Sequence, residues 1–266
     1  MSHSLPYTVN CSLLFTELPL HQRPAAARRA GFDAVEFWWP FESAAPGDAE
    51  VDAFVAAIEN AGVSLTGLNL FAGRLPGPDR GVLSHPDRVP ELRDNLDVVA
   101  AIAERTGTAG FNALYGLRRD GVEPAEQDET ALQNTLAAAK ALEAVGGTVL
   151  IEPISGSADY PLITAADGRA FVAAAKEAGA ANVALLADFY HLAVNGDDVA
   201  AVVRDHAAEF GHIQIADAPG RGEPGSGDLP LMDLLARAQD GGYSGHVGLE
   251  YKPTGASADS FGWLRG

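Results

Sequence analysis

The chain has 266 residues, of which 47% are hydrophobic and 20% are charged, the balance of an ordinary globular protein. Asp and Glu total 36 against 18 Lys and Arg, giving a net charge of −18. This charge argues against a nucleic-acid partner, which requires a basic surface. The single cysteine, Cys11, excludes an intrachain disulfide and a zinc site built on cysteines.

Short β-rich runs alternate along the chain with longer Ala-rich runs at helical spacing. We expect eight strands, at Tyr7–Cys11, Ala34–Phe37, Ser64–Leu70, Gly110–Leu114, Thr148–Glu152, Val183–Asp188, His212–Ala216 and His246–Glu250. The expected helices between them are Leu20–Ala30, Ala49–Ala61, Pro86–Thr106, Ala125–Ala144, Ala165–Ala178, Val199–Phe210 and Leu229–Asp240. Glycine follows these helices and fits the left-handed residue that commonly ends a helix. These glycines are Gly31, Gly62, Gly107, Gly146, Gly179, Gly211 and Gly241.

Strands that alternate with helices of this length predict parallel β-α units. Eight units in 266 residues favour an α/β fold of the closed (β/α)8 type, a TIM barrel, over an open sheet. We find no linker and expect one domain over residues 1–266. Only Ala256–Leu264 follows the eighth strand, so the C-terminal helix must be short. The Gly- and Pro-rich stretch Phe71–Ser84 would lie over the barrel mouth, as a lid or as an ordered loop.

Targeting and membrane signals are not apparent in the sequence. The opening MSHSLPYTVNCSLLF has no basic segment followed by a long apolar run, and no 18 apolar residues are consecutive. We therefore expect neither a signal peptide nor a spanning helix. We expect a cytoplasmic protein that does not bind a membrane.

Four consecutive strands carry, at or near their ends, a side chain able to bind a metal ion or move a proton. These side chains are Glu152, Asp188, Gln214 and Glu250, spaced 36, 26 and 36 residues apart, about one β-α unit each. In a barrel all four would meet at the C-terminal end of the strands, where the chemistry of such barrels takes place. Any single carboxylate there could instead cap the following helix, but three together would repel one another unless a cation neutralised them.

Three carboxylates and one amide make an all-oxygen set of ligands, which suits Mg²⁺ or Mn²⁺ better than Zn²⁺. Further polar residues near the strand ends are candidates for binding substrate: His191, Arg221, Lys252 and Asn69. Glu36 would face the same interior, and Phe15 and Trp39 could reach the mouth. No glycine-rich nucleotide motif is present, so we expect no nucleotide cofactor.

Several segments resemble the hydroxypyruvate isomerase family. They are IEPI (151–154), ADFYH (187–191), HIQIADAPGRGEPGSGD (212–228), GLEYKP (248–253), VNCSLLFTELP (9–19) and GFDAVEFWWPF (31–41). The resemblance covers nearly the whole chain, and 212–228 is its most specific part. The wider group is the sugar-isomerase-like barrels that resemble xylose isomerase, which share the metal site and differ in substrate.

The resemblance implies that Glu152, Asp188, Gln214 and Glu250 hold one divalent metal ion. It also implies that Glu152 and Glu250 face each other across the substrate and shuttle a proton. The reaction would be hydroxypyruvate to 2-hydroxy-3-oxopropanoate (tartronate semialdehyde) through an enediolate, without a redox cofactor. The substrate would be a small anionic hydroxy-keto acid, whose carboxylate we expect Arg221 to bind.

The chain departs from the family pattern at two places that border the substrate. It has Leu68-Asn69 where the family usually carries His-Asn, and SGSADYPLIT after IEPI where the family tends to carry Asn and a D-x-P-x-F-like stretch. An isomerase or epimerase of a longer sugar or sugar acid, such as 2-oxo-tetronate, therefore competes with hydroxypyruvate isomerase. A keto-cyclitol dehydratase, a DNA-repair endonuclease and a non-catalytic binding protein on the same barrel are less compatible with the sequence. Barrels of this kind often associate, so a homo-oligomer is a further alternative.

Overall fold

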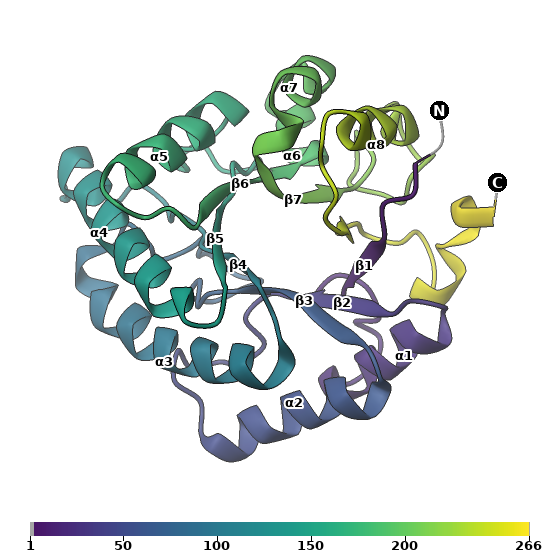
Figure 1. Cartoon of the computed structure of the whole chain (residues 1–266), viewed down its shortest axis with the longest axis horizontal. Helices are drawn as coiled ribbons and strands as arrows, with labels where there is room; N and C mark the ends of the chain where they lie inside the picture. The colour runs from purple at the N-terminus through teal and green to yellow at the C-terminus, as the bar shows by residue number, and fades with distance from the viewer. Residues whose placement is uncertain (1–2, 266) are drawn as a thin grey trace.

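The computed structural model describes residues 3–265 and has eight parallel strands that close into a barrel in sequence order (Figure 1). The strands are β1 (Tyr7–Asn10), β2 (Ala34–Phe37), β3 (Ser64–Asn69), β4 (Gly110–Asn112), β5 (Thr148–Ile151), β6 (Val183–Asp188), β7 (Phe210–Ile215) and β8 (Val247–Leu249). β8 pairs with β1, with Val247 opposite Tyr7, which closes the ring. The predicted TIM barrel is confirmed, and several predicted strands are one or two residues too long.

Helices surround the barrel (Figure 1). They are α1 (Arg23–Arg29), α2 (Asp48–Ala61), α3 (Val89–Thr106), α4 (Pro124–Glu143), α5 (Ala165–Glu177), α6 (Phe189–Val194), α7 (Val199–His206) and α8 (Leu231–Asp240). Helix α6 was not predicted, because it is too short to show helical periodicity. It begins directly after β6 because the side chain of Asp188 accepts hydrogen bonds from the backbone N–H groups of Tyr190 and His191. None of the described helices has the length and apolarity needed to cross a membrane.

The predictions of a C-terminal helix and of the glycines that end helices need correction. The segment Ala256–Leu264 forms no α-helix but two 3₁₀ turns, Ser257–Asp259 and Gly262–Arg265. Gly255 and Gly262 flank the first turn, and glycine disfavours a continuous helix. Among the glycines, Gly62 (φ 64°) and Gly107 (φ 72°) are left-handed helix ends as predicted. Gly211 instead lies inside β7. After α8 the left-handed residue is Gly242 (φ 105°), one residue later than predicted.

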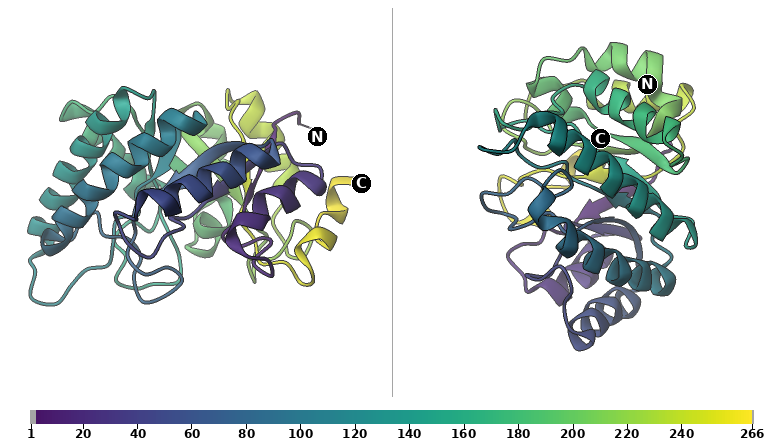
Figure 2. Two further views of the ribbon diagram at one scale, coloured as in Figure 1. Left: turned by 90° about the horizontal axis from the view of Figure 1, so that it is seen from below. Right: turned by 90° about the vertical axis from the view of Figure 1, so that its left-hand side faces the viewer.

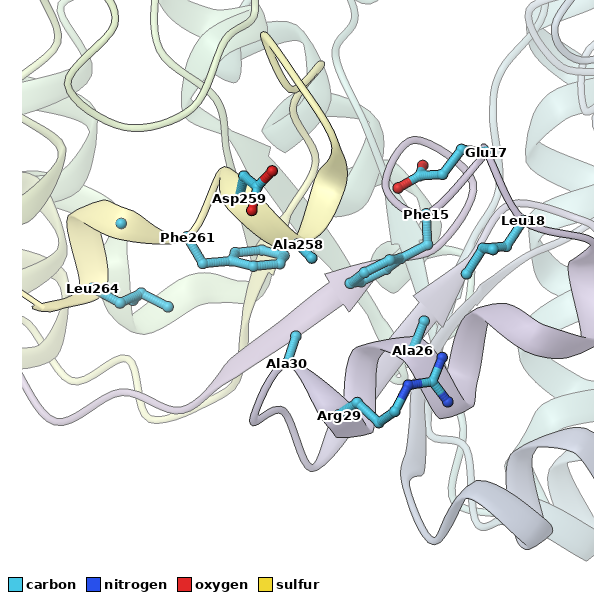
Figure 3. A pocket seen from close by; sticks show the side chains of 11 residues that line it. Phe15, Glu17, Leu18, Ala26, Arg29, Ala30, Ala258, Asp259, Phe261 and Leu264 are labelled. Atoms are coloured by element: carbon cyan, nitrogen blue, oxygen red, sulfur yellow. The ribbon is translucent and has the colours of Figure 1, made fainter.

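Because these turns stand where a full helix after β8 would lie, a cleft of about 620 Å³ remains between α1 and the C-terminal segment. Figure 3 shows Phe15 and Phe261 pointing toward each other across this cleft, with Ala26 and Ala30 on the helix side. Phe15 was expected near the barrel mouth. It packs here against Phe261, with ring centroids 6.0 Å apart.

The register of the strands determines which side chains share the barrel interior. Asp188 on β6 lies opposite Gln214 on β7, and Gln214 lies opposite Gly248 on β8. Glu152 and Glu250 follow β5 and β8 directly. The longer loops project from one side of the ring of helices (Figure 2). Parallel strands therefore bring the predicted acids to one end of the barrel.

Candidate active site

Three carboxylates are buried together at the C-terminal end of the barrel. The exposed fractions of Glu152, Asp188 and Glu250 are 4%, 0% and 3%. One guanidinium joins them: an Nη atom of Arg221 lies 3.3 Å from Oε1 of Glu250 and 3.7 Å from Oδ2 of Asp188. The predicted acids and Arg221 thus converge on one place, and the excess of negative charge there favours a further cation.

Several buried oxygens at this place have no hydrogen-bond partner within residues 3–265. They are Oδ2 of Asp188, Oε1 of Gln214 and Oε2 of Glu250. A buried polar atom without a partner costs about 1–3 kcal/mol, and more when it is charged. A hard divalent cation would satisfy carboxylate and amide oxygens together. The residues present therefore fit a site for a divalent metal ion.

Burial and mutual repulsion also disfavour the charged forms of two of these acids. Burial raises the pKa of Glu152 well above its ordinary value, and the neighbouring charges of Glu250 and Asp188 raise it further. Burial likewise raises the pKa of Glu250 to about 8, although Arg221 opposes that rise. Two acids with raised pKa values at one site are suited to taking up and releasing protons.

His191 lies closer to the acids than its place in the sequence indicated. Its Nε2 is 3.6 Å from Oδ2 of Asp188 and 4.0 Å from Oε1 of Glu152. Within the described part of the chain, Glu152, Asp188 and His191 form a group that could hold a metal ion, with ligand atoms within 4.8 Å of one another. The protonation state of the imidazole decides whether its Nε2 could bind a metal ion.

The hydrogen bonds of His191 assign its tautomer. The backbone N–H of Ser155 donates to Nδ1 over 3.0 Å, and the Ser155 hydroxyl lies 2.7 Å from the same nitrogen. Nδ1 must therefore carry the lone pair, and in a neutral imidazole the proton then sits on Nε2. Burial lowers the pKa of His191 to about 4, which keeps the ring neutral. Nε2 is thus a donor facing the acids, as expected of a substrate-binding group.

Arg221 adopts an uncommon backbone conformation, with φ at 60°. Its guanidinium lies over the ring of Tyr190, 5.5 Å from the centroid, and its Nε donates to the carbonyl oxygen of Glu250. Although burial opposes the charge, Glu250, Asp188 and Glu152 raise the pKa of Arg221. Strained backbone at a buried charge is common in functional sites, and here it aims a permanent cation into the site.

Two residues that were not predicted from the sequence hold the carboxylates in place. Nδ2 of Asn112, the last residue of β4, donates to Oε2 of Glu152 over 2.6 Å. Nε1 of Trp38 donates to Oε1 of Glu250 over 2.7 Å. The signal for Trp38 was strand alternation, because it lies two residues after the inward-facing Glu36. Trp39, which was expected near the mouth, instead donates to the carbonyl oxygen of Ser43.

A cavity of about 330 Å³ opens onto the acids, at the small end of the range for ligand sites. Asn69 and Lys252 line it together with Leu75, Pro76, Gly77 and Arg80 of the stretch Phe71–Ser84. That stretch therefore covers part of the cavity. Nδ2 of Asn69 is buried and lacks a hydrogen-bond partner among the described residues. All four predicted substrate-binding residues line the cavity.

Comparison with known proteins agrees with the barrel fold. A family model described as "Xylose isomerase-like TIM barrel" matches residues 24–266. A solved structure from Brucella melitensis, titled as an AP endonuclease of family 2, superposes with a TM-score of 0.88 at 28% identity and covers 98% of each chain.

Three curated relatives also match over nearly their full lengths. A Streptomyces coelicolor protein named "Putative hydroxypyruvate isomerase" is 53% identical, over 97% of this chain and 95% of the relative. The 2-oxo-tetronate isomerase of Cupriavidus necator is 34% identical, over 97% of each chain. The hydroxypyruvate isomerase of Escherichia coli is 29% identical, over 98% of each chain.

Proposed function

This chain belongs to the xylose isomerase-like TIM barrel family, and we propose that it is a metal-dependent isomerase that converts hydroxypyruvate into 2-hydroxy-3-oxopropanoate. Relatives named as isomerases of hydroxy-keto acids match it over nearly its full length, which supports an isomerase. The observation that carries the proposal is the cluster of buried acids beside partnerless oxygens on Asp188, Gln214 and Glu250.

In this proposal Glu152, Asp188, Gln214 and Glu250 hold one Mg²⁺ or Mn²⁺ ion. Nε2 of His191 carries a proton, because Nδ1 accepts from the backbone of Ser155. Metal binding at Nε2 would require the proton to move to Nδ1, where it would face that N–H. His191 is therefore a hydrogen-bond donor to the substrate rather than a fifth ligand.

Isomerisation moves a proton from C3 to C2 of the substrate and a hydroxyl proton from O3 to O2, so no atom or electron is gained. When bound, the divalent ion stabilises the negative charge of the enediolate. Glu152 and Glu250, which both line the cavity, exchange the carbon-bound proton. Nε2–H of His191 and Nδ2–H of Asn69 donate hydrogen bonds to substrate oxygens, and the guanidinium of Arg221 binds the substrate carboxylate.

A longer substrate such as 2-oxo-tetronate is a specific second candidate. Relatives with that activity in their names are 34% and 28% identical to this chain. Ser155, at one of the two places where the chain departs from the hydroxypyruvate isomerase pattern, lines the cavity, whereas Leu68 does not. A DNA-repair endonuclease has less support, because the possible metal group within residues 3–265 contains one histidine and the net charge is −18.

Proton NMR of the purified protein with hydroxypyruvate and Mg²⁺ in D₂O, with and without a chelator, tests the proposal. We expect metal-dependent formation of the semialdehyde with deuterium at C2. We expect Glu152→Gln and Glu250→Gln to abolish turnover, whereas Glu59→Gln on the exposed face of α2 should leave it unchanged. Turnover of 2-oxo-tetronate alone would shift the substrate assignment, and inactivity with every keto acid despite bound metal would refute the proposed activity.

A further inference from the structure

Glu36 is a buried carboxylate in the barrel interior, beside the proposed metal ligands but not among them. Its Oε1 accepts from Nε2 of Gln214 over 2.7 Å and from Nδ2 of Asn10 over 3.1 Å. Its Oε2 lies 2.7 Å from Nε2 of His212. Three polar side chains from β1 and β7 thus converge on one acid of β2. Burying a carboxylate is costly, so this arrangement requires a reason beyond packing.

The barrel also leaves space for this side chain. A Cβ atom added at Gly248 would lie 2.6 Å from Oε1 of Glu36, and one added at Gly67 would lie 3.2 Å from Cβ of Glu36. Glycine at these two positions, on β3 and β8, therefore admits Glu36 to the interior.

The consequence of these contacts lies in the orientation of the Gln214 amide. A carboxylate oxygen only accepts hydrogen bonds, so the amide nitrogen of Gln214 must face Glu36. A half-turn of the amide would place its oxygen 2.7 Å from Oε1 of Glu36, where two acceptors would repel. With the nitrogen held there, Oε1 of Gln214 points away from Glu36 and is buried without a partner in the described chain.

We propose that Glu36 is a positioning residue that fixes the amide of Gln214 so that its oxygen is presented to the metal ion. This inference rests on the proposed metal-binding role of Gln214. It assigns to Glu36 a role in metal affinity, although Glu36 does not itself bind the metal. Two other side chains hold the carboxylate of Glu36. His212 lies at Oε2, and Asn10 donates to Oε1, which also accepts from Gln214.

Mn²⁺ titration of the full chain by calorimetry, without substrate, tests this role. Glu36→Met keeps the length of the side chain and removes both acceptors. We expect a 10- to 100-fold loss of Mn²⁺ affinity, roughly the range for residues that support metal ligands. Thr8→Val is the matched control: it removes a partly buried hydrogen bond to Thr66, and within residues 3–265 neither threonine side chain hydrogen-bonds to Gln214. It should leave the affinity within about twofold.

A rescue separates orientation from general damage to the fold. A carboxylate presents an oxygen whichever way it turns, so Gln214→Glu combined with Glu36→Met should restore Mn²⁺ affinity. Gly67→Ala provides a milder variant, because the added Cβ would press on Glu36 alone. It should weaken Mn²⁺ binding less than Glu36→Met does. If the folded Gly67→Ala and Glu36→Met proteins both bind Mn²⁺ normally, the positioning role is wrong.

Different outcomes would overturn the metal site and the role of Glu36. If Gln214→Ala itself leaves Mn²⁺ affinity unchanged, then Gln214 is not a ligand and the proposed metal site must be revised. If Gln214→Ala weakens binding while the Glu36 and Gly67 variants do not, only the role of Glu36 is overturned.

Discussion

Nε1 of Trp38 donates to Oε1 of Glu250 over 2.7 Å, while the other oxygen of that carboxylate is buried without a partner within residues 3–265. The indole thus holds one oxygen of Glu250 and leaves the second directed at the site. Asn112 does the same for Glu152, through Oε2. Each of the two proposed proton-transfer groups therefore has a neutral donor on one oxygen, which fixes its geometry, and Glu250 is also close to the guanidinium of Arg221.

Trp38→Phe retains the aromatic ring and removes the donor. A hydrogen bond to a charged group contributes about 1.5–3 kcal/mol, so we expect kcat for hydroxypyruvate to fall roughly tenfold or more. Trp39→Phe, whose indole donates to Ser43 away from the cavity, is the control and should have kcat near that of the parent chain. Equal kcat values in the two variants would show that the contact between Trp38 and Glu250 has no catalytic role.

Arg221→Ala should raise KM for hydroxypyruvate by roughly 10- to 100-fold, because charge-assisted hydrogen bonds contribute about 1.5–3 kcal/mol. Lys252 lines the same cavity but is exposed, so Lys252→Ala should raise KM much less. Steady-state kinetics of both variants measure the difference. A larger effect at Lys252 would assign the substrate carboxylate to that residue instead.

His191→Phe distinguishes a substrate donor from a metal ligand. Because Ser155 holds Nδ1 as an acceptor, we expect Mn²⁺ affinity to stay within about twofold and kcat/KM to fall about 100-fold, the scale for removing a donor to a developing oxyanion. The ¹⁵N chemical shifts of His191 should report a lone pair on Nδ1 and a proton on Nε2. Large loss of Mn²⁺ affinity would instead make His191 a ligand.

Metal ions should stabilise the protein more at high pH than at low pH. The pKa values of Glu152 and Glu250 are raised in the metal-free fold, whereas in the unfolded chain they are about 4.3. The folded state therefore binds more protons than the unfolded state. Its stability falls as pH rises from about 4.3 through the pKa of Glu250 in the fold, about 8. A bound cation removes this penalty but competes with the protons.

Differential scanning calorimetry at pH 5.5 and pH 8 tests that expectation. The rise in Tm on adding Mg²⁺ at about 100 times its Kd should be larger at pH 8. Comparing samples with and without metal at each pH cancels the separate contribution of His191. That contribution has the opposite sign: the pKa of His191 is lowered to about 4, so its stabilising effect is lost as pH falls. Equal shifts in Tm would contradict proton competition at the acids.

The alternation of strands and helices could be predicted from the sequence. That alternation in turn predicted the barrel and placed the four candidate ligands at one end of it. Both follow from local chemistry: a period of two in strands, glycine after helices, and a polar residue at the end of an apolar run. Glu152, Asp188 and Glu250 could be placed together because parallel strands put their carboxyl ends on one side.

Only the tertiary structure decided how these groups are held. The contacts of Trp38 with Glu250, of Asn112 with Glu152 and of Glu36 with Gln214 join residues 212, 40 and 178 positions apart. The tautomer of His191 depends on the backbone N–H of Ser155, 36 residues away. Local sequence patterns carry no information about hydrogen bonds between residues so far apart in the chain. These contacts form only when the barrel closes and brings the side chains of different strands together. The chain alone therefore determined which groups meet, and the closed barrel determined which atom each group presents.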